Sequence, residues 1–211
     1  HEVGRRVTAV LSAMDQPLGC AVGNAVEVAE AIATLRGQGP RDLVDHCLAI
    51  AAEMAVLGGV AREWKEGRAL AERALQDGRA LTCFRRWIAG QGGDARVADD
   101  PLLLPQAACQ RMTAAPYSGY VAALDAREFG LTAVALGAGR ERKGQRIDLS
   151  VGIVLHRQVG DQVAAGEPLW TIHAANETAA QAAEERLLRA CAWSAAPVAS
   201  PPLIYEIIRE G

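Results

Sequence analysis

Apolar and polar positions in the first half of the chain follow a helical period. Residues 42–57 carry apolar side chains three and four positions apart, which predicts an amphipathic helix. Further helices are predicted over 25–36, 67–76 and 79–89, each ending close to a glycine. A short β-branched apolar run at 7–11 predicts a buried strand before them. The first half is therefore expected to be rich in helices.

The second half has a different pattern, with short apolar runs separated by turn residues. Asp125 and Asn176 are the expected N-caps of two helices that run through Leu136 and Ala190. The proline-bounded stretch 99–105 is the expected connector between the two halves. Strands are predicted at 111–115, 119–124, 151–156, 168–173 and 203–208. This half is therefore expected to be an α+β domain.

Composition narrows the possible classes of protein. The 211 residues are 50% hydrophobic with a net charge of -3, which argues against a nucleic-acid-coating surface. No stretch of 18 or more apolar residues avoids charge, so no membrane span is expected. The opening residues 1–6 have neither an initiator Met nor a signal-peptide layout, and we expect the chain to begin inside a larger protein. Five scattered cysteines without a CxxC pair are typical of reduced thiols in the cytoplasm.

The segment 160–169 contains the clearest local motif. A Gly-Asp turn and a Gly-x-Pro-Leu turn predict two short strands of a compact barrel-sandwich, the layout of lipoyl and biotinyl carrier domains. Such carriers need a lysine at a hairpin tip, because an amine has to be acylated by the cofactor. The only lysines are Lys65 and Lys143, both before this segment. We therefore expect the motif to be architectural and the chain to have no organic cofactor.

Two other features have both a functional and a structural interpretation. The glycine turn and basic cluster at 137–143 could cradle a phosphate, but the loop leads towards a strand rather than a helix, which favours a solvated loop. His156 and His173 end two predicted strands and could pair across them, as structural rather than catalytic residues. None of the four histidines has a metal-ligand spacing. The residues alone indicate no catalytic group.

The order of several segments resembles that of the pyrimidine-nucleoside phosphorylase (thymidine phosphorylase) family, over essentially the whole chain. The segments that carry the resemblance are 4–11, 14–28, 39–43, 91–94, 137–140, 147–148, 151–156, 160–163 and 201–206. The resemblance implies an α/β plus α+β fold. Residues 1–104 would form the rear part of the phosphorylase α/β domain, and residues 105–211 a small C-terminal domain with a barrel-sandwich (biotinyl/lipoyl-like) element.

The resemblance also implies a reaction, in which thymidine or uridine and phosphate give the free base and a pentose 1-phosphate. In the family, a glycine- and serine-rich phosphate loop and an Arg/Ser/Lys base-binding set lie upstream of the matched segments. We therefore assign no catalytic and no substrate-binding residue to this chain, and expect it to be inactive alone. A homodimer is expected only with the upstream helical lobe.

One family site maps onto this chain. Bacterial members bind a potassium ion, and the matching ligands here are the backbone carbonyls of Leu18 and Ala21 and the carboxylate of Glu30. Oxygen ligands suit a hard cation, and Glu30 would lie about two turns into a helix, able to point back to the carbonyls. The alternative is that Glu30 is an ordinary surface residue of that helix.

Two other functions remain open beside this interpretation. An AMP-type nucleotide phosphorylase would share the architecture, although the stretch 23–28 looks more like the pyrimidine-nucleoside branch. A non-catalytic binding module built on the barrel-sandwich is the second alternative, and the missing lysine argues against a carrier of this kind.

Overall fold

The computed structural model describes residues 6–209, which form helices and small antiparallel sheets in two compact units. The first unit comprises the described residues 6–13, 32–99 and 202–209, and the second unit comprises 14–31 and 100–201. Helix α1 (Ala25–Leu35) crosses from the second unit into the first. These units are defined by internal contacts, so the family domain limits at 104 and 105 stay a prediction.

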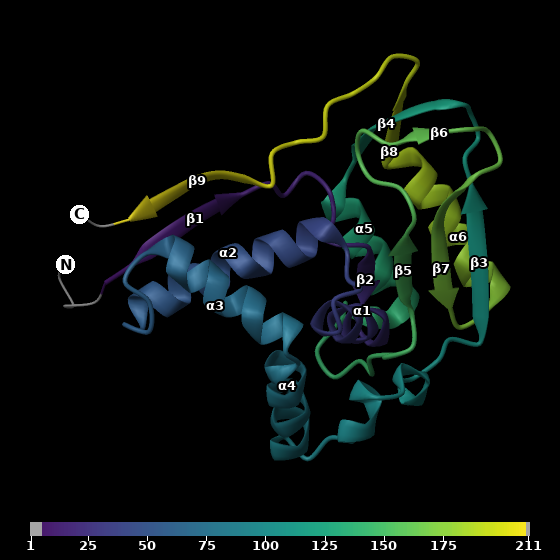
Figure 1. Cartoon of the computed structure of the whole chain (residues 1–211). Helices are drawn as coiled ribbons and strands as arrows, with labels where there is room; N and C mark the ends of the chain where they lie inside the picture. Colours follow the sequence, from purple (N-terminus) through teal and green to yellow (C-terminus); the bar gives the residue numbers. More distant parts are fainter. Residues whose placement is uncertain (1–5, 210–211) are drawn as a thin grey trace. The chain divides into compact units, whose positions relative to one another are not determined.

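In the first unit, helices lie on one side of a two-stranded ribbon. Strand β1 pairs antiparallel with β9, and α2 runs along this ribbon (Figure 1). The elements of the unit are β1 (Thr8–Ser12), α2 (Arg41–Leu57), α3 (Trp64–Gln76), α4 (Arg79–Gly90), a 3-10 turn (Ala95–Ala98) and β9 (Ile204–Arg209). The helices predicted at 42–57 and 79–89 and the strand predicted at 7–11 are present within one residue at each end. The predicted burial of this strand is wrong, because no residue of β1 is buried and its alternate side chains are exposed.

Polar contacts fasten the ribbon to α2. Ser12 Oγ and His46 Nε2 share a hydrogen bond of 2.8 Å. Arg209 donates through both Nε and Nη2 to the carboxylate of Glu53, whose side chain is buried. A buried carboxylate is costly without a partner, so this bidentate pair holds the end of β9 on the helix.

The second unit contains two open sheets. The first has the order β2-β5-β7-β3 and the second β6-β4-β8, all antiparallel. The elements are β2 (Ala21–Gly23), β3 (Cys109–Ala114), β4 (Gly119–Leu124), β5 (Gly152–Leu155), β6 (Gln162–Val163), β7 (Pro168–Ala174), β8 (Cys191–Ser194), α5 (Ala126–Ala133), a π-helical turn (Val134–Ala138), α6 (Glu177–Arg189) and a 3-10 turn (Pro101–Leu103). The predicted caps are confirmed, because Asp125 accepts from the N–H of Glu128 and Asn176 from that of Ala179.

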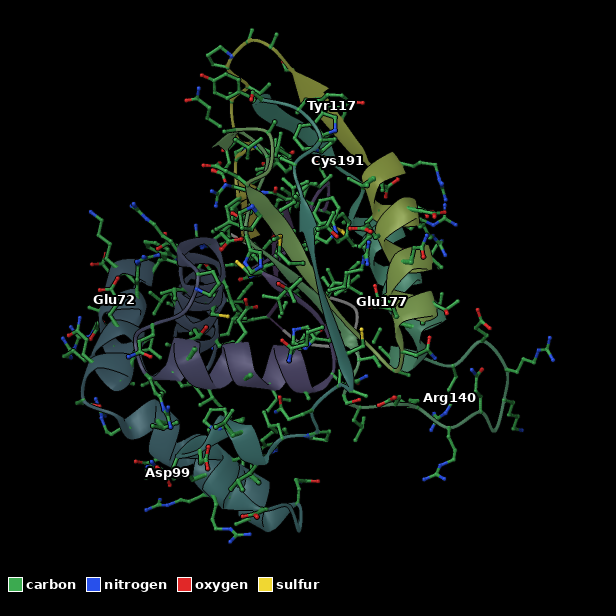
Figure 2. The ribbon with its side chains drawn as sticks, turned by 90° about the vertical axis from the view of Figure 1, so that its right-hand side faces the viewer. Glu72, Asp99, Tyr117, Arg140, Glu177 and Cys191 are labelled. Atoms are coloured by element: carbon green, nitrogen blue, oxygen red, sulfur yellow. The ribbon has the colours of Figure 1, made fainter. Side chains whose placement is uncertain are left out.

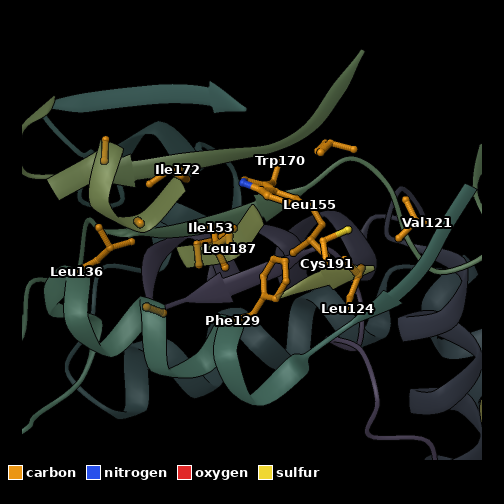
Figure 3. Close-up of a cluster of buried hydrophobic side chains, with 14 of the residues drawn as sticks. Val121, Leu124, Phe129, Leu136, Ile153, Leu155, Trp170, Ile172, Leu187 and Cys191 are labelled. Atoms are coloured by element: carbon orange, nitrogen blue, oxygen red, sulfur yellow. The ribbon is translucent and has the colours of Figure 1, made fainter. Parts of the chain in front are cut away.

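The main hydrophobic core lies in the second unit, where α5 and α6 pack on the four-stranded sheet. Alternate residues of β5 and β7 face the helices, including Ile153, Leu155 and Ile172 (Figure 3). The rings of Phe129 and Trp170 meet edge to face with centroids 5.5 Å apart. This core holds in place the four-stranded sheet that includes β2, next to the candidate site.

The structure does not confirm the predicted histidine pair or the predicted barrel-sandwich element. His156 and His173 do not pair: the strand register places His173 opposite Gly152, and His156 bonds Thr171 instead. The barrel-sandwich element is not confirmed, since no closed barrel is seen among residues 6–209. No described helix has the length and apolarity to cross a membrane.

Candidate functional site

The segment between Pro17 and Ala21 forms a tight turn just before β2. Gly19 has a φ of +70°, in the left-handed region where glycine is favoured, and it is buried. A Cβ at Gly19 would lie 2.5 Å from Glu30 Oε2, so a larger residue cannot occupy this position without displacing that carboxylate. The absence of a side chain at Gly19 therefore makes room for Glu30.

The Glu30 carboxylate returns to the turn from the second turn of α1. Its Oε1 accepts hydrogen bonds from the N–H groups of Cys20 at 2.8 Å and Ala21 at 3.1 Å. Glu30 is half-buried, in contrast to a freely solvated surface glutamate. The Glu30 carboxylate therefore lies at this segment, bonded to two N–H groups, and its role as an ion ligand stays a prediction.

Strand pairing orients the Ala21 carbonyl. The N–H of Leu155 donates to Cys20 O at 2.7 Å, so the Cys20 carbonyl faces β5. Adjacent residues of an antiparallel strand direct their backbone groups to opposite edges, and β2 is the edge strand of its sheet. The Ala21 carbonyl therefore points away from β5, on the same side as its N–H group, which meets Glu30.

The loop after β5 braces the turn. Gln158 Nε2 donates to Gly19 O at 3.0 Å, and the N–H of Val159 donates to Gln16 Oε1 at 2.8 Å. Leu18 lies within this braced turn and is exposed. The arrangement brings the carboxylate of Glu30 and the Ala21 carbonyl to one side of a fixed turn that also carries Leu18.

Such a cluster of oxygen donors is suited to a hard cation rather than to a transition metal. Within residues 6–209, no group of three or more His, Cys, Asp or Glu side chains is placed to hold a metal ion. Backbone carbonyls can coordinate a monovalent cation, and this turn combines backbone carbonyls with one carboxylate, that of Glu30.

The basic loop at 137–143 is organised by its own side chains. Gln145 Oε1 accepts from the N–H groups of Glu141 at 3.0 Å and Arg142 at 3.3 Å, and Arg140 Nε donates to Gln145 O. Figure 2 shows Arg140 on a loop whose side chains point away from the body of the second unit. Because two of its N–H groups are engaged internally, the loop fits the solvated interpretation better than a phosphate cradle.

The two histidines on the sheet have structural environments. His156 Nε2 lies 2.8 Å from Thr171 Oγ1, and burial together with the charge of Arg157 lowers the pKa of its imidazole. Burial lowers the pKa of His173 as well. The lowered pKa favours the neutral ring for both histidines at pH 7. No carboxylate among the described residues pairs with either ring to orient it as a base, so we interpret the bond from His156 to the Thr171 hydroxyl as structural.

Two polar clusters escaped the sequence analysis. The Ser12–His46 pair links a strand to a helix 34 residues away, a contact that no local sequence pattern indicates. Arg111 bonds both Glu177 and Glu184 of α6, and Cys109 Sγ lies 3.2 Å from Glu177 Oε2 (Glu177 is labelled in Figure 2). The carboxylate of Glu177 raises the pKa of the Cys109 thiol, which makes this cysteine a poor nucleophile.

Comparison with known proteins identifies the class. Residues 1–81 match the a/b domain of a glycosyl transferase family, and residues 120–194 match the pyrimidine nucleoside phosphorylase C-terminal domain. A pyrimidine-nucleoside phosphorylase of Geobacillus stearothermophilus is 45% identical over 208 residues, 99% of this chain and 48% of that protein. One of Staphylococcus aureus (strain USA300) is 44% identical over 210 residues, 100% of this chain and 48% of that protein.

Helices, small sheets and these two domain matches define the class as a glycosyl transferase a/b domain joined to a phosphorylase C-terminal domain. The chain belongs to the pyrimidine-nucleoside phosphorylase family. It spans about half the length of the curated relatives it matches. Neither the AMP-type alternative nor the non-catalytic binding module is favoured by these matches.

Proposed function

We propose that the chain supports the reversible phosphorolysis of thymidine and uridine as part of a pyrimidine-nucleoside phosphorylase. In this reaction a phosphate oxygen forms a bond to C1′ of the pentose while the bond from C1′ to the base breaks, and the base leaves with a proton. The observation that carries the proposal is the 45% identity to such an enzyme across 99% of the chain.

The chemistry requires donors for the phosphate anion and for the leaving base. The functional side chains described above supply no such set, and the relatives contain about as much sequence again beyond the part matched here. We assign the phosphate and base contacts to that other part. The present chain would then contribute a framework and an ion site rather than reacting groups.

A chimera tests this proposal. The chain would replace the matched part of the Geobacillus stearothermophilus enzyme, and release of thymine or uracil would be measured with phosphate present. We expect the chimera to be active and the chain alone to convert neither nucleoside. An inactive but folded chimera, or brisk turnover by the chain alone, would contradict the assignment.

A potassium ion is the cofactor that we propose for the turn before β2. The carbonyls of Leu18 and Ala21 and the carboxylate of Glu30 would hold it, and the geometry of Glu30 and Ala21 supports this choice because both face one side of a braced turn. When bound, the ion would supply a fixed positive charge. Strand pairing with β5 and the hydrogen bond to Glu30 support this assignment for Ala21.

Glu30→Gln removes the negative charge but keeps an oxygen for the two N–H donors. In the active chimera we expect this variant to lose at least tenfold in apparent potassium affinity, measured as activity against potassium concentration. Glu27→Gln is the matched control, because Glu27 also lies on α1 and accepts from a backbone N–H, that of Gly23 at 2.7 Å. Equal potassium dependence in both variants would refute the assignment of Glu30 as a potassium ligand.

The finer expectations about assembly belong to the same proposal. Phosphate and a pyrimidine nucleoside are its small-molecule partners, with neither nucleic acid nor membrane, and the complete enzyme would be a homodimer. A cytoplasmic location is supported by the five cysteines, none of which forms a disulfide. For the segment 160–169 we keep an architectural role, supported by Glu167, which accepts from the N–H of Ala164 at 3.1 Å.

A further inference from the structure

The outer face of the β1–β9 ribbon is exposed and mostly apolar, with the charged Glu206 also on it. Ala9 lies opposite Ile208 and Leu11 opposite Glu206, and all four side chains point away from α2. Ile208 is 50% exposed, Leu11 is 44% exposed, and Val7, which precedes β1 in the same alternation, is 57% exposed. We call Val7, Ala9, Leu11 and Ile208 the ribbon face.

The opposite face of the ribbon is covered. Val10 and Ile207 form a pair on the side of α2, and Ser12 and Arg209 bond side chains of that helix. A two-stranded ribbon with one covered face is marginal in water, and its unpaired edges are open to a further strand. A sheet in an a/b domain is normally covered by helices on both faces.

The described residues of the first unit supply only these two strands to a chain whose residues 1–81 match an a/b domain. The matched relatives are about twice as long as the part that corresponds to this chain. The relatives therefore contain enough further sequence, outside the part matched here, to supply additional strands.

We propose that the ribbon face and its strand edges form a docking surface for the other half of a pyrimidine-nucleoside phosphorylase, and that the two halves assemble non-covalently when they are separate polypeptides. This inference rests on the proposed function. The partner presents apolar side chains to Leu11 and Ile208 and a strand to an edge of the ribbon, as in β-strand addition.

The test pairs this chain with the part of the Geobacillus stearothermophilus phosphorylase that it does not match. The two polypeptides are co-expressed, one with a tag, and purified through the tag; light scattering after gel filtration then gives the mass. We expect a complex that contains both chains, with slowed amide hydrogen exchange at β1 and β9.

Substitution locates the surface. Ile208→Glu places a charge in the ribbon face and should reduce the fraction of complex recovered at least tenfold. Met112→Glu is the matched control, because Met112 also lies on a strand and is 52% exposed, but in the second unit. The control should leave the complex intact, and the far-UV circular dichroism of both variants should equal that of the parent chain.

Several results would overturn the proposal. These are an insoluble or unbound partner in co-expression, equal loss of complex in both variants, and a dimer of this chain alone that is abolished by Ile208→Glu, which would make a second copy the occupant. The chimera separates this inference from the proposed function. An active chimera without a complex in trans refutes only the docking surface, and a complex beside an inactive chimera refutes only the assigned activity.

Discussion

The close approach of α2 and α3 at Gly67 leads to a quantitative stability prediction. A Cβ at Gly67 would lie 2.7 Å from the Ala52 carbonyl oxygen and 3.1 Å from Ala52 Cα. Both are backbone atoms, which cannot rotate away as a side chain could, so Gly67→Ala forces the helices apart. Overpacking of this kind costs about 1–3 kcal/mol. Alanine regains about 1 kcal/mol of helix propensity over glycine.

We therefore expect Gly67→Ala to lower the free energy of unfolding by about 1 kcal/mol, the difference between these two effects. Gly90→Ala is the control, because Gly90 also lies in a helix of the first unit and has nothing within 4 Å of its added Cβ. The control should be neutral or stabilising. Urea unfolding followed by circular dichroism at 222 nm measures both variants. If Gly67→Ala is as stable as Gly90→Ala, the helices do not pack as closely as described.

Three further predictions concern single side chains. Arg209→Ala leaves the carboxylate of Glu53, which is 4% exposed, without its partner, and should destabilise the chain by about 1–3 kcal/mol in urea unfolding; an unchanged midpoint would show that the pair adds nothing. Burial raises the pKa of Cys191 to about 11, so Ellman's reagent at pH 8 should modify exposed Cys83 quickly and Cys191 only after unfolding; equal rates would contradict this. Hydrogen bonds from a neighbouring arginine lower the pKa of Asp94 to about 2. Its contribution to stability is present above the ordinary carboxyl pKa and is lost as pH falls towards 2, so a carboxyl carbon titration by NMR with a midpoint near 4 would refute the contact.

Helix limits were predictable where local chemistry sets them. Asp125 and Asn176 cap their helices through side-chain oxygens, a contact within three residues in the sequence. The start of α3 was misplaced at Gly67, whereas the helix begins at Trp64. The low helix propensity of glycine suggested a helix boundary at this position. In the structure Gly67 lies inside the helix, where the backbone of Ala52 leaves no room for a side chain. Tertiary packing of this kind leaves no local signal.

Strand pairing could not be predicted from the sequence either, because it depends on contacts between distant residues. The strands β2 and β8 are short, at three and four residues, and were not predicted, and β2 pairs with β5 across more than a hundred residues. The predicted helix after Asp125 changes to a π-helical turn at Val134, and Gly137, at a φ of 113°, departs from helical geometry. Period alone does not distinguish these states.

The candidate ion site shows how much depends on such pairing. A family pattern identifies Leu18, Ala21 and Glu30, but the direction of the Ala21 carbonyl follows from the register of β2 against β5, and the room for Glu30 follows from Gly19. The turn is part of the second unit, bonded to the loop after β5, although it precedes most of the first unit in sequence. An ion bound there would therefore act first on the edge of the four-stranded sheet. It would stabilise β2 in its register, because a displaced Ala21 would lose both the ion and the hydrogen bond to Glu30.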